Sequence, residues 1–163
     1  MKIKKFSDPY QEVIYHFNQN AVEYVVVGMA GINYYASNPS MLFSTLDYDI
    51  FIEPTLGNTK NALEILIKLK FEISTKEGLF KPTELKNVVR NQSTLMATTT
   101  EGIMIELILG ISGYAFSEIA TDTVIFNIGK VPVKVGKLTK LLNSKKIADR
   151  PKDRQFLKRY KSE

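Results

Sequence analysis

The sequence predicts an α+β fold, of the mixed α/β kind, in which helices flank one central mixed sheet and two helices end the chain. Segments with apolar residues at helical spacing alternate with short runs of β-branched residues. Hydrophobic residues make up 44% and charged residues 24% of the 163 residues, which is typical of globular proteins and indicates neither disorder nor a fibrous repeat. Because no repeat or linker interrupts this length, we expect a single domain over residues 1–163.

The first part of the chain is predicted to alternate between helix and strand. Asp8 and Pro9 form a helix-start signal, and apolar residues at helical spacing continue the helix for about a dozen residues. Residues 24–27 form a β-branched strand, which ends at Gly28. This glycine opens a second predicted helix, which stops before the Asn-Pro pair at residues 38–39.

The next part is predicted to hold a strand at residues 46–52 and then a helix that Asn58 caps. The apolar residues of that helix recur at helical spacing, which indicates one buried face. A strand at residues 71–73 follows the helix, and residues 77–86 are expected to be irregular.

Four further strands are predicted in the second half of the chain. Two of them, at residues 87–98 and 102–109, are expected to lie side by side. The stretch 112–114 is expected to be a loop, and a last pair of short strands is predicted at residues 123–126 and 131–135.

The segment 137–163 is predicted to be a basic helical tail, with one helix that carries Leu138, Leu141, Leu142 and Ala148 and a second that starts at Pro151. The chain has 22 basic and 17 acidic residues, for a net charge of +5. Eight basic and three acidic residues lie in 145–163, which leaves 14 of each in the rest. This local excess suits a phosphate or nucleic-acid partner, and a solvated basic helix face is the alternative.

Two absences limit the function classes. The sequence has no cysteine, which excludes disulfides, thiolate metal sites and cysteine nucleophiles and fits a reducing cytoplasm. It has no apolar run of about 20 residues and no signal-peptide pattern at its start. We therefore expect a cytoplasmic protein without a membrane partner.

The predicted strand at residues 46–52 carries an unusual acidic pair, Asp47 and Asp49. Side chains alternate along a strand, so both acids lie on one face about 7 Å apart along the backbone, while Tyr48, Ile50 and Ile52 face the core. Two ionised groups this close repel, so that either one pKa rises or a cation lies between them. Carboxylates are ligands of Mg²⁺, and the alternative is a polar strand face that only contacts water.

A third acid, Glu106, interrupts the apolar run of residues 103–109. A carboxylate on such a strand is costly unless it has a partner. The partner is either a lysine in a buried salt bridge or a cation shared with Asp47 and Asp49. The turn at Gly28 adds an anion site for a triphosphate, although a strand-glycine-helix turn is also a common plain connection.

Taken in chain order, the Gly28 turn, the acidic pair and Glu106 resemble the polymerase-β-like nucleotidyltransferase superfamily. Residues 145–153, KKIADRPKD, are similar to the Lys-x-x-Ala-x-Arg-Pro-Lys-Asp ending of small bacterial nucleotidyltransferases, including the abortive-infection toxin type. The resemblance spans roughly residues 24–157 and depends on the order and spacing of short motifs. It implies a nucleotidyltransferase-like fold with a glycine turn for the triphosphate and three carboxylates for magnesium.

The resemblance also implies a role for individual residues. Gly28 would lie against the nucleotide phosphates, with Thr45 close to them. Asp47 and Asp49 would hold Mg²⁺, and Glu106 would bridge a second metal or take the proton of the attacking hydroxyl. The residues expected on the nucleotide or acceptor side are Lys145, Arg150, Lys152 and Asp153. Lys145 lies on the apolar side of its predicted helix and should lean inward.

The implied reaction is magnesium-dependent transfer of a nucleoside monophosphate from an NTP to a hydroxyl of RNA, such as a tRNA, or of a protein. For the toxin type, a cognate antitoxin would be a further partner. The chain differs from relatives at Met29, where they usually have glycine or serine, at Phe43, where many have arginine, and at Phe156, where toxin-type relatives often have an acid. These differences leave open a non-catalytic module that binds nucleotide, RNA or a protein partner.

Overall fold

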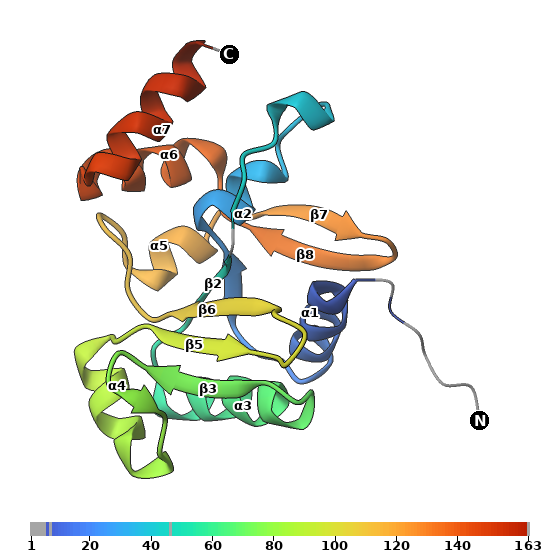
Figure 1. Cartoon of the computed structure of the whole chain (residues 1–163), viewed down its shortest axis with the longest axis vertical. Coiled ribbons are helices and arrows are strands. Elements are labelled where there is room, and N and C mark those ends of the chain that lie inside the picture. The colour runs from blue at the N-terminus through green and yellow to red at the C-terminus, as the bar shows by residue number, and fades with distance from the viewer. Residues whose placement is uncertain (1–5, 7, 46, 163) are drawn as a thin grey trace.

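The computed structural model describes residue 6, residues 8–45 and residues 47–162, and within them it confirms the predicted α+β fold class (Figure 1). The strands are β1 Tyr24–Val26, β2 Tyr48–Ile52, β3 Glu72–Thr75, β4 Gly78–Leu79, β5 Leu95–Thr98, β6 Met104–Ile108, β7 Val124–Ile128 and β8 Val131–Val135. The helices are α1 Pro9–Gln19, α2 Gly28–Asn33, α3 Leu56–Lys68, α4 Leu85–Asn91, α5 Phe116–Ala120, α6 Leu138–Ala148 and α7 Pro151–Ser162. Short 3-10 helices span Pro39–Met41 and Pro82–Glu84.

The described strands form one mixed sheet in the order β4-β3-β5-β6-β2-β1-β8-β7. Strand β2 runs parallel to β6, and β1 runs parallel to β8, whereas the other neighbours are antiparallel. Strands β2 and β6 lie side by side although most of the middle of the chain separates them. Such a separation is expected, because two parallel strands can be joined only by a long crossover connection. This crossover brings the predicted acids of two distant segments together.

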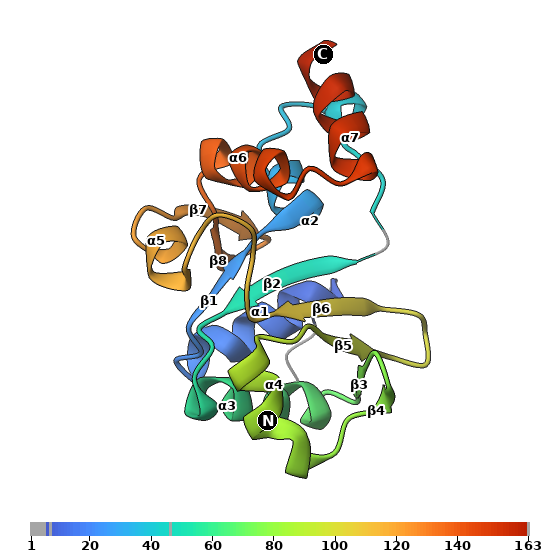
Figure 2. The ribbon, with the colours of Figure 1, turned by 90° about the vertical axis from the view of Figure 1, so that its left-hand side faces the viewer.

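Helices cover the two faces of the sheet unequally. Figure 2 shows α3 and α4 on one side of the strands, and α6 and α7 on the other side. Tyr48, Ile50 and Ile52 of β2 are buried, as their alternation predicted. The acidic face of β2 therefore looks toward α6 and the start of α7, which bounds the site described below.

The helix starts agree with the sequence in one case and differ in another. Asp8 caps α1, since its carboxylate accepts a hydrogen bond from the Tyr10 backbone N–H at 2.7 Å. The prediction that Asn58 caps α3 is wrong, because the hydroxyl of Thr55 caps this helix. The Asn58 side-chain amide instead bonds the backbone of two earlier residues. It accepts from the Glu23 N–H at 2.8 Å and donates to the Glu23 and Glu53 carbonyls.

The strand predicted at residues 87–98 is wrong in its first part, where the chain forms α4. Val88 is the buried residue of this helix, so the two neighbouring valines that suggest a strand in fact lie on different faces of a helix turn. Gln92 ends the helix in the left-handed region with a φ of 50°, and β5 then follows as predicted. The short helix α5 was not predicted from the sequence.

Other boundaries shift by a few residues. The predicted irregular stretch 77–86 contains β4, a 3-10 turn and the first residues of α4, and α2 ends at Asn33, before the predicted limit at residues 38–39. The predicted strand start at Leu46 lies outside the described residues, and β2 begins at Tyr48. Both C-terminal helices are present, and α7 starts at Pro151 as predicted. In the described part of the chain, no helix is long and apolar enough to cross a membrane.

Candidate functional site

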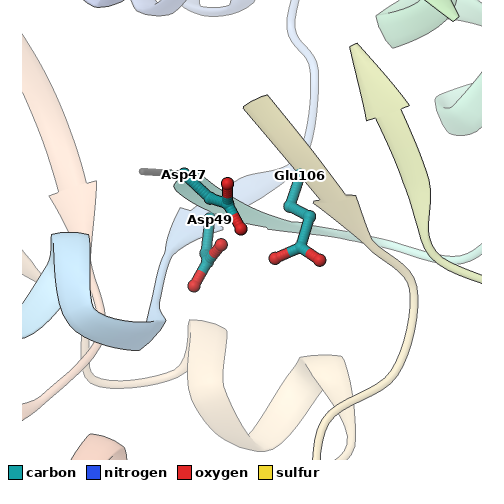
Figure 3. Close-up of side chains that lie close together, drawn as sticks. All are labelled: Asp47, Asp49 and Glu106. Atoms are coloured by element: carbon teal, nitrogen blue, oxygen red, sulfur yellow. The ribbon is translucent and has the colours of Figure 1, made fainter. Parts of the chain in front are cut away.

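The three predicted acids converge at the junction of β2 and β6. Asp49 and Glu106 are direct partners in the parallel register, and Asp47 precedes Asp49 on the same face. One carboxylate oxygen from each residue lies within 4.8 Å of those of the other two. Figure 3 shows the side chains of Asp47 and Asp49 entering one space from β2 while Glu106 enters it from β6. The period-2 prediction for this face is thus confirmed.

Burial, and after it the neighbouring carboxylates, raise the pKa values of both aspartates. The pKa of Asp49 is raised to about 8, first by burial and then by the neighbouring Glu106 and Asp47, while Lys145 acts in the opposite direction. Burial and Glu106 raise the pKa of Asp47, and Lys152 lowers it. A nearby divalent cation would favour the ionised form of these groups.

The donor set fits Mg²⁺. The Asp49 Oδ1 atom is buried and has no hydrogen-bond partner, which is costly for a carboxylate oxygen unless a cation or a proton compensates it. All three groups are hard oxygen ligands of the kind that Mg²⁺ selects. Asp47, Asp49 and Glu106 are therefore the residues that would hold the metal.

Gly28, the first residue of α2, lies against this acidic group. Its φ is +64°, and a Cβ atom at this position would lie 2.0 Å from Asp49 Oδ2. The Val27 N–H donates to the Asp49 carbonyl at 3.0 Å, so the strand end and the aspartate are joined through the backbone as well. The absence of a side chain at residue 28 leaves the room that the Asp49 carboxylate occupies.

Basic side chains from α6 and α7 face the acids. Asp153 is 1% exposed, accepts from Arg150 Nε at 2.6 Å and lies 3.6 Å from Lys145 Nζ. Burial acts to raise the pKa of Asp153, but Arg150 and Lys145 hold it below its usual value. Burial lowers the pKa of Lys145, which is 13% exposed and leans inward as predicted. Asp153 thus anchors two cations at the edge of the site.

All nine predicted site residues line one cavity of about 500 Å³. They are Gly28, Thr45, Asp47, Asp49, Glu106, Lys145, Arg150, Lys152 and Asp153. The Thr45 hydroxyl donates a hydrogen bond to the Asp47 carbonyl at 2.9 Å and accepts one from the Asp47 N–H at 3.3 Å. This hydroxyl therefore shapes the turn before β2.

The cavity also has a wall that sequence reasoning missed, made by Thr94, Ile108, Ser112 and Ser144 among others. Ile108 follows Glu106 by two residues, so strand alternation places it on the same face and was a usable signal. The Ser144 hydroxyl donates to the Ser112 carbonyl at 2.7 Å. This contact joins α6 to a loop, and no sequence pattern predicts it.

The three residues that depart from the motifs of the family that the sequence resembles lie in two different places. Met29 lines the cavity beside Gly28. Phe43 and Phe156 instead contact each other as a buried edge-to-face pair, with ring centroids 4.7 Å apart. Neither ring lines the cavity, so these two phenylalanines attach α7 to the segment before β2 and leave the acids unobstructed.

A scan against protein-family models finds no match for the chain, and a search of the curated proteins finds none either.

We expect the metal-free protein to lose stability as the pH rises from about 4 to about 8. The folded state holds a proton on Asp49 with a pKa of about 8, whereas the unfolded chain releases it near its usual value of 3.8. The contribution of Asp49 to the free energy of unfolding is therefore greatest below its unfolded-state pKa. It falls by roughly 2–5 kcal/mol as the pH rises toward 8.

Thermal melting at several pH values, with and without MgCl₂, measures this dependence. Mg²⁺ should raise the melting temperature more at pH 8 than at pH 5, because the cation replaces the proton. An equal effect of Mg²⁺ at both pH values, or no effect, would contradict the metal site.

Proposed function

We propose that the chain is a magnesium-dependent nucleotidyltransferase that moves a nucleoside monophosphate from an NTP to a hydroxyl of RNA, such as a tRNA, or of a protein. The observation that supports this best is the convergence of three carboxylates, one with a buried oxygen that lacks a partner, opposite a basic cluster in the same cavity. The resemblance to the polymerase-β-like superfamily leads to the same reaction.

In the proposed reaction, the acceptor oxygen bonds to the α-phosphorus, the bond from that phosphorus to the bridging oxygen breaks, and pyrophosphate leaves. Asp47 and Asp49 would hold Mg²⁺, which supplies Lewis-acid polarisation of the phosphoryl group. Glu106 completes this set of ligands or takes the proton of the acceptor hydroxyl. Lys145 and Arg150, which line the same cavity, would contact the phosphates of the NTP.

The second candidate function is a non-catalytic module that binds nucleotide, RNA or a protein partner. Met29 favours this candidate, because its side chain lines the cavity beside the Gly28 turn, where the triphosphate would lie. The resemblance to the toxin type adds a cognate antitoxin as a proposed partner, and the absence of cysteine fits a location in the reducing cytoplasm.

Incubation with Mg²⁺, each α-labelled NTP and either total RNA or a protein mixture tests the proposal. Wild type should transfer label to one acceptor class, and Asp47→Ala should lower transfer about a thousandfold, since a bound metal contributes several kcal/mol to the transition state. EDTA should have the same effect as the substitution.

Label transfer by Asp47→Ala at the wild-type rate would overturn the catalytic assignment. Saturable NTP or RNA binding by a wild type that transfers no label under any condition would favour the binding module.

A further inference from the structure

The sheet face that carries the acids continues beyond them as an open strip. In β6, β5 and β3, buried side chains alternate with partly exposed ones, and the buried set faces α3 and α4 (Figure 2). The partly exposed set lies on the same face as Glu106. We call the residues Ser74, Met96, Thr98 and Met104 the strip.

The strand register places the strip directly beside Asp47, Asp49 and Glu106. Glu106 pairs with Asp49 on one side and with Met96 on the other, and Met96 pairs with Ser74. Met104 and Asp47 precede the paired residues Ile105 and Tyr48, and Met104 pairs with Thr98. Strands are about 4.8 Å apart, so the strip extends about 10 Å past Glu106.

The strip has the chemistry of a platform for a flat, uncharged group. Met96 and Met104 are partly exposed and do not belong to the apolar residues that pack against the core. Methionine sulfur contacts aromatic rings favourably, and the hydroxyls of Ser74 and Thr98 can hydrogen-bond to base edges. No member of the strip is charged, and the exposed Glu72, which pairs with Thr98, lies at its edge in β3.

Positive charge lies at the end of the strip nearest the acids. Lys152 is exposed, lines the same cavity as Asp47 and is close enough to lower the pKa of that carboxyl. Arg150 lines the cavity beside it. A neutral platform bordered by cations matches a single-stranded nucleic acid, in which flat bases alternate with phosphates.

We propose that the strip binds the last base of a single-stranded RNA, so that the terminal hydroxyl of this RNA lies at Asp47, Asp49 and Glu106 as the acceptor. The inference rests on the proposed transfer reaction and assigns the position and class of its acceptor. The backbone phosphates of the RNA then lie toward Lys152 and Arg150.

Fluorescence anisotropy with a 5′-labelled single-stranded RNA, in Mg²⁺ and without NTP, tests the strip. Wild type should bind the intact RNA about tenfold more tightly than the same RNA with an abasic last sugar. The double variant Met96→Ser and Met104→Ser should bind both RNAs equally and as weakly as wild type binds the abasic one. Met104→Ser alone should lose part of the preference, and melting curves verify that each variant is folded.

Ile67→Ser is the matched control, because Ile67 is a 55% exposed apolar residue of α3, outside the strip. It should keep the wild-type preference for the intact RNA. A preference that survives the double substitution, or a wild type that binds both RNAs equally, overturns the proposal. Transfer to protein without RNA binding overturns it in favour of a protein acceptor. If wild type prefers the intact RNA but transfers no nucleotide, the strip is a base-binding surface and the proposed transfer reaction is overturned.

Discussion

Replacement of Asp49 by asparagine should abolish nucleotide transfer and at the same time stabilise the metal-free protein. The carboxylate is buried, one of its oxygens has no partner, and Glu106 is its direct neighbour in the sheet. Asparagine removes the repulsion and can donate to Glu106, so at pH 8 the free energy of unfolding should rise by roughly 1–3 kcal/mol. Transfer should fall about a thousandfold, because an uncharged ligand holds Mg²⁺ poorly.

Denaturant unfolding in EDTA at pH 8 and labelled-NTP transfer in Mg²⁺ measure the two effects on the same preparation. Asp149→Asn is the matched control. Asp149 is exposed, lies outside the cavity and has a φ of 51°, a left-handed conformation that asparagine tolerates well. This control should change neither quantity. An Asp49→Asn protein less stable than wild type would show that the carboxylate has a structural role instead.

Local patterns were sufficient to predict the acidic face but not its partner. Alternation along β2 places Asp47 and Asp49 together, and it depends only on the neighbouring residues. The contact with Glu106 depends on β6 lying next to β2, which is a property of the sheet order and of a long crossover. The sequence supplied Glu106 as a candidate through its apolar surroundings, and the fold determined its neighbours.

The errors in the predicted elements have the same origin. The valines at the start of the predicted strand 87–98 have high β propensity, but a 3-10 turn before them and packing of Val88 select a helix. Asn58 has the right chemistry for a cap, yet its amide is used by the backbone near β1 and β2. In both cases tertiary contacts override a correct local preference, which a single sequence does not reveal.

Replacement of Gly28 by alanine should have the second large effect, because two separate costs apply at this position. A φ of +64° strains any residue with a Cβ, which costs about 1–2 kcal/mol. The new Cβ would also lie 2.0 Å from Asp49 Oδ2, so the carboxylate must move. We expect the free energy of unfolding to fall by about 3 kcal/mol, and transfer to fall at least about a hundredfold, since a displacement of 1 Å in such a site has this effect.

Two other glycines separate these costs. Gly102 has a φ of +90° with nothing within 4 Å of its position for a Cβ, so Gly102→Ala should lose only about 1–2 kcal/mol and keep its activity. Gly57 lies in α3 with open space and no positive φ, so Gly57→Ala should be as stable as wild type or slightly more stable. If Gly28→Ala loses no more stability and activity than Gly102→Ala, the close approach of residue 28 to Asp49 contributes to neither stability nor activity. A larger loss at Gly28 alone would mean that the missing side chain keeps the Asp49 carboxylate in place, and Mg²⁺ titration of the melting temperature should then also weaken.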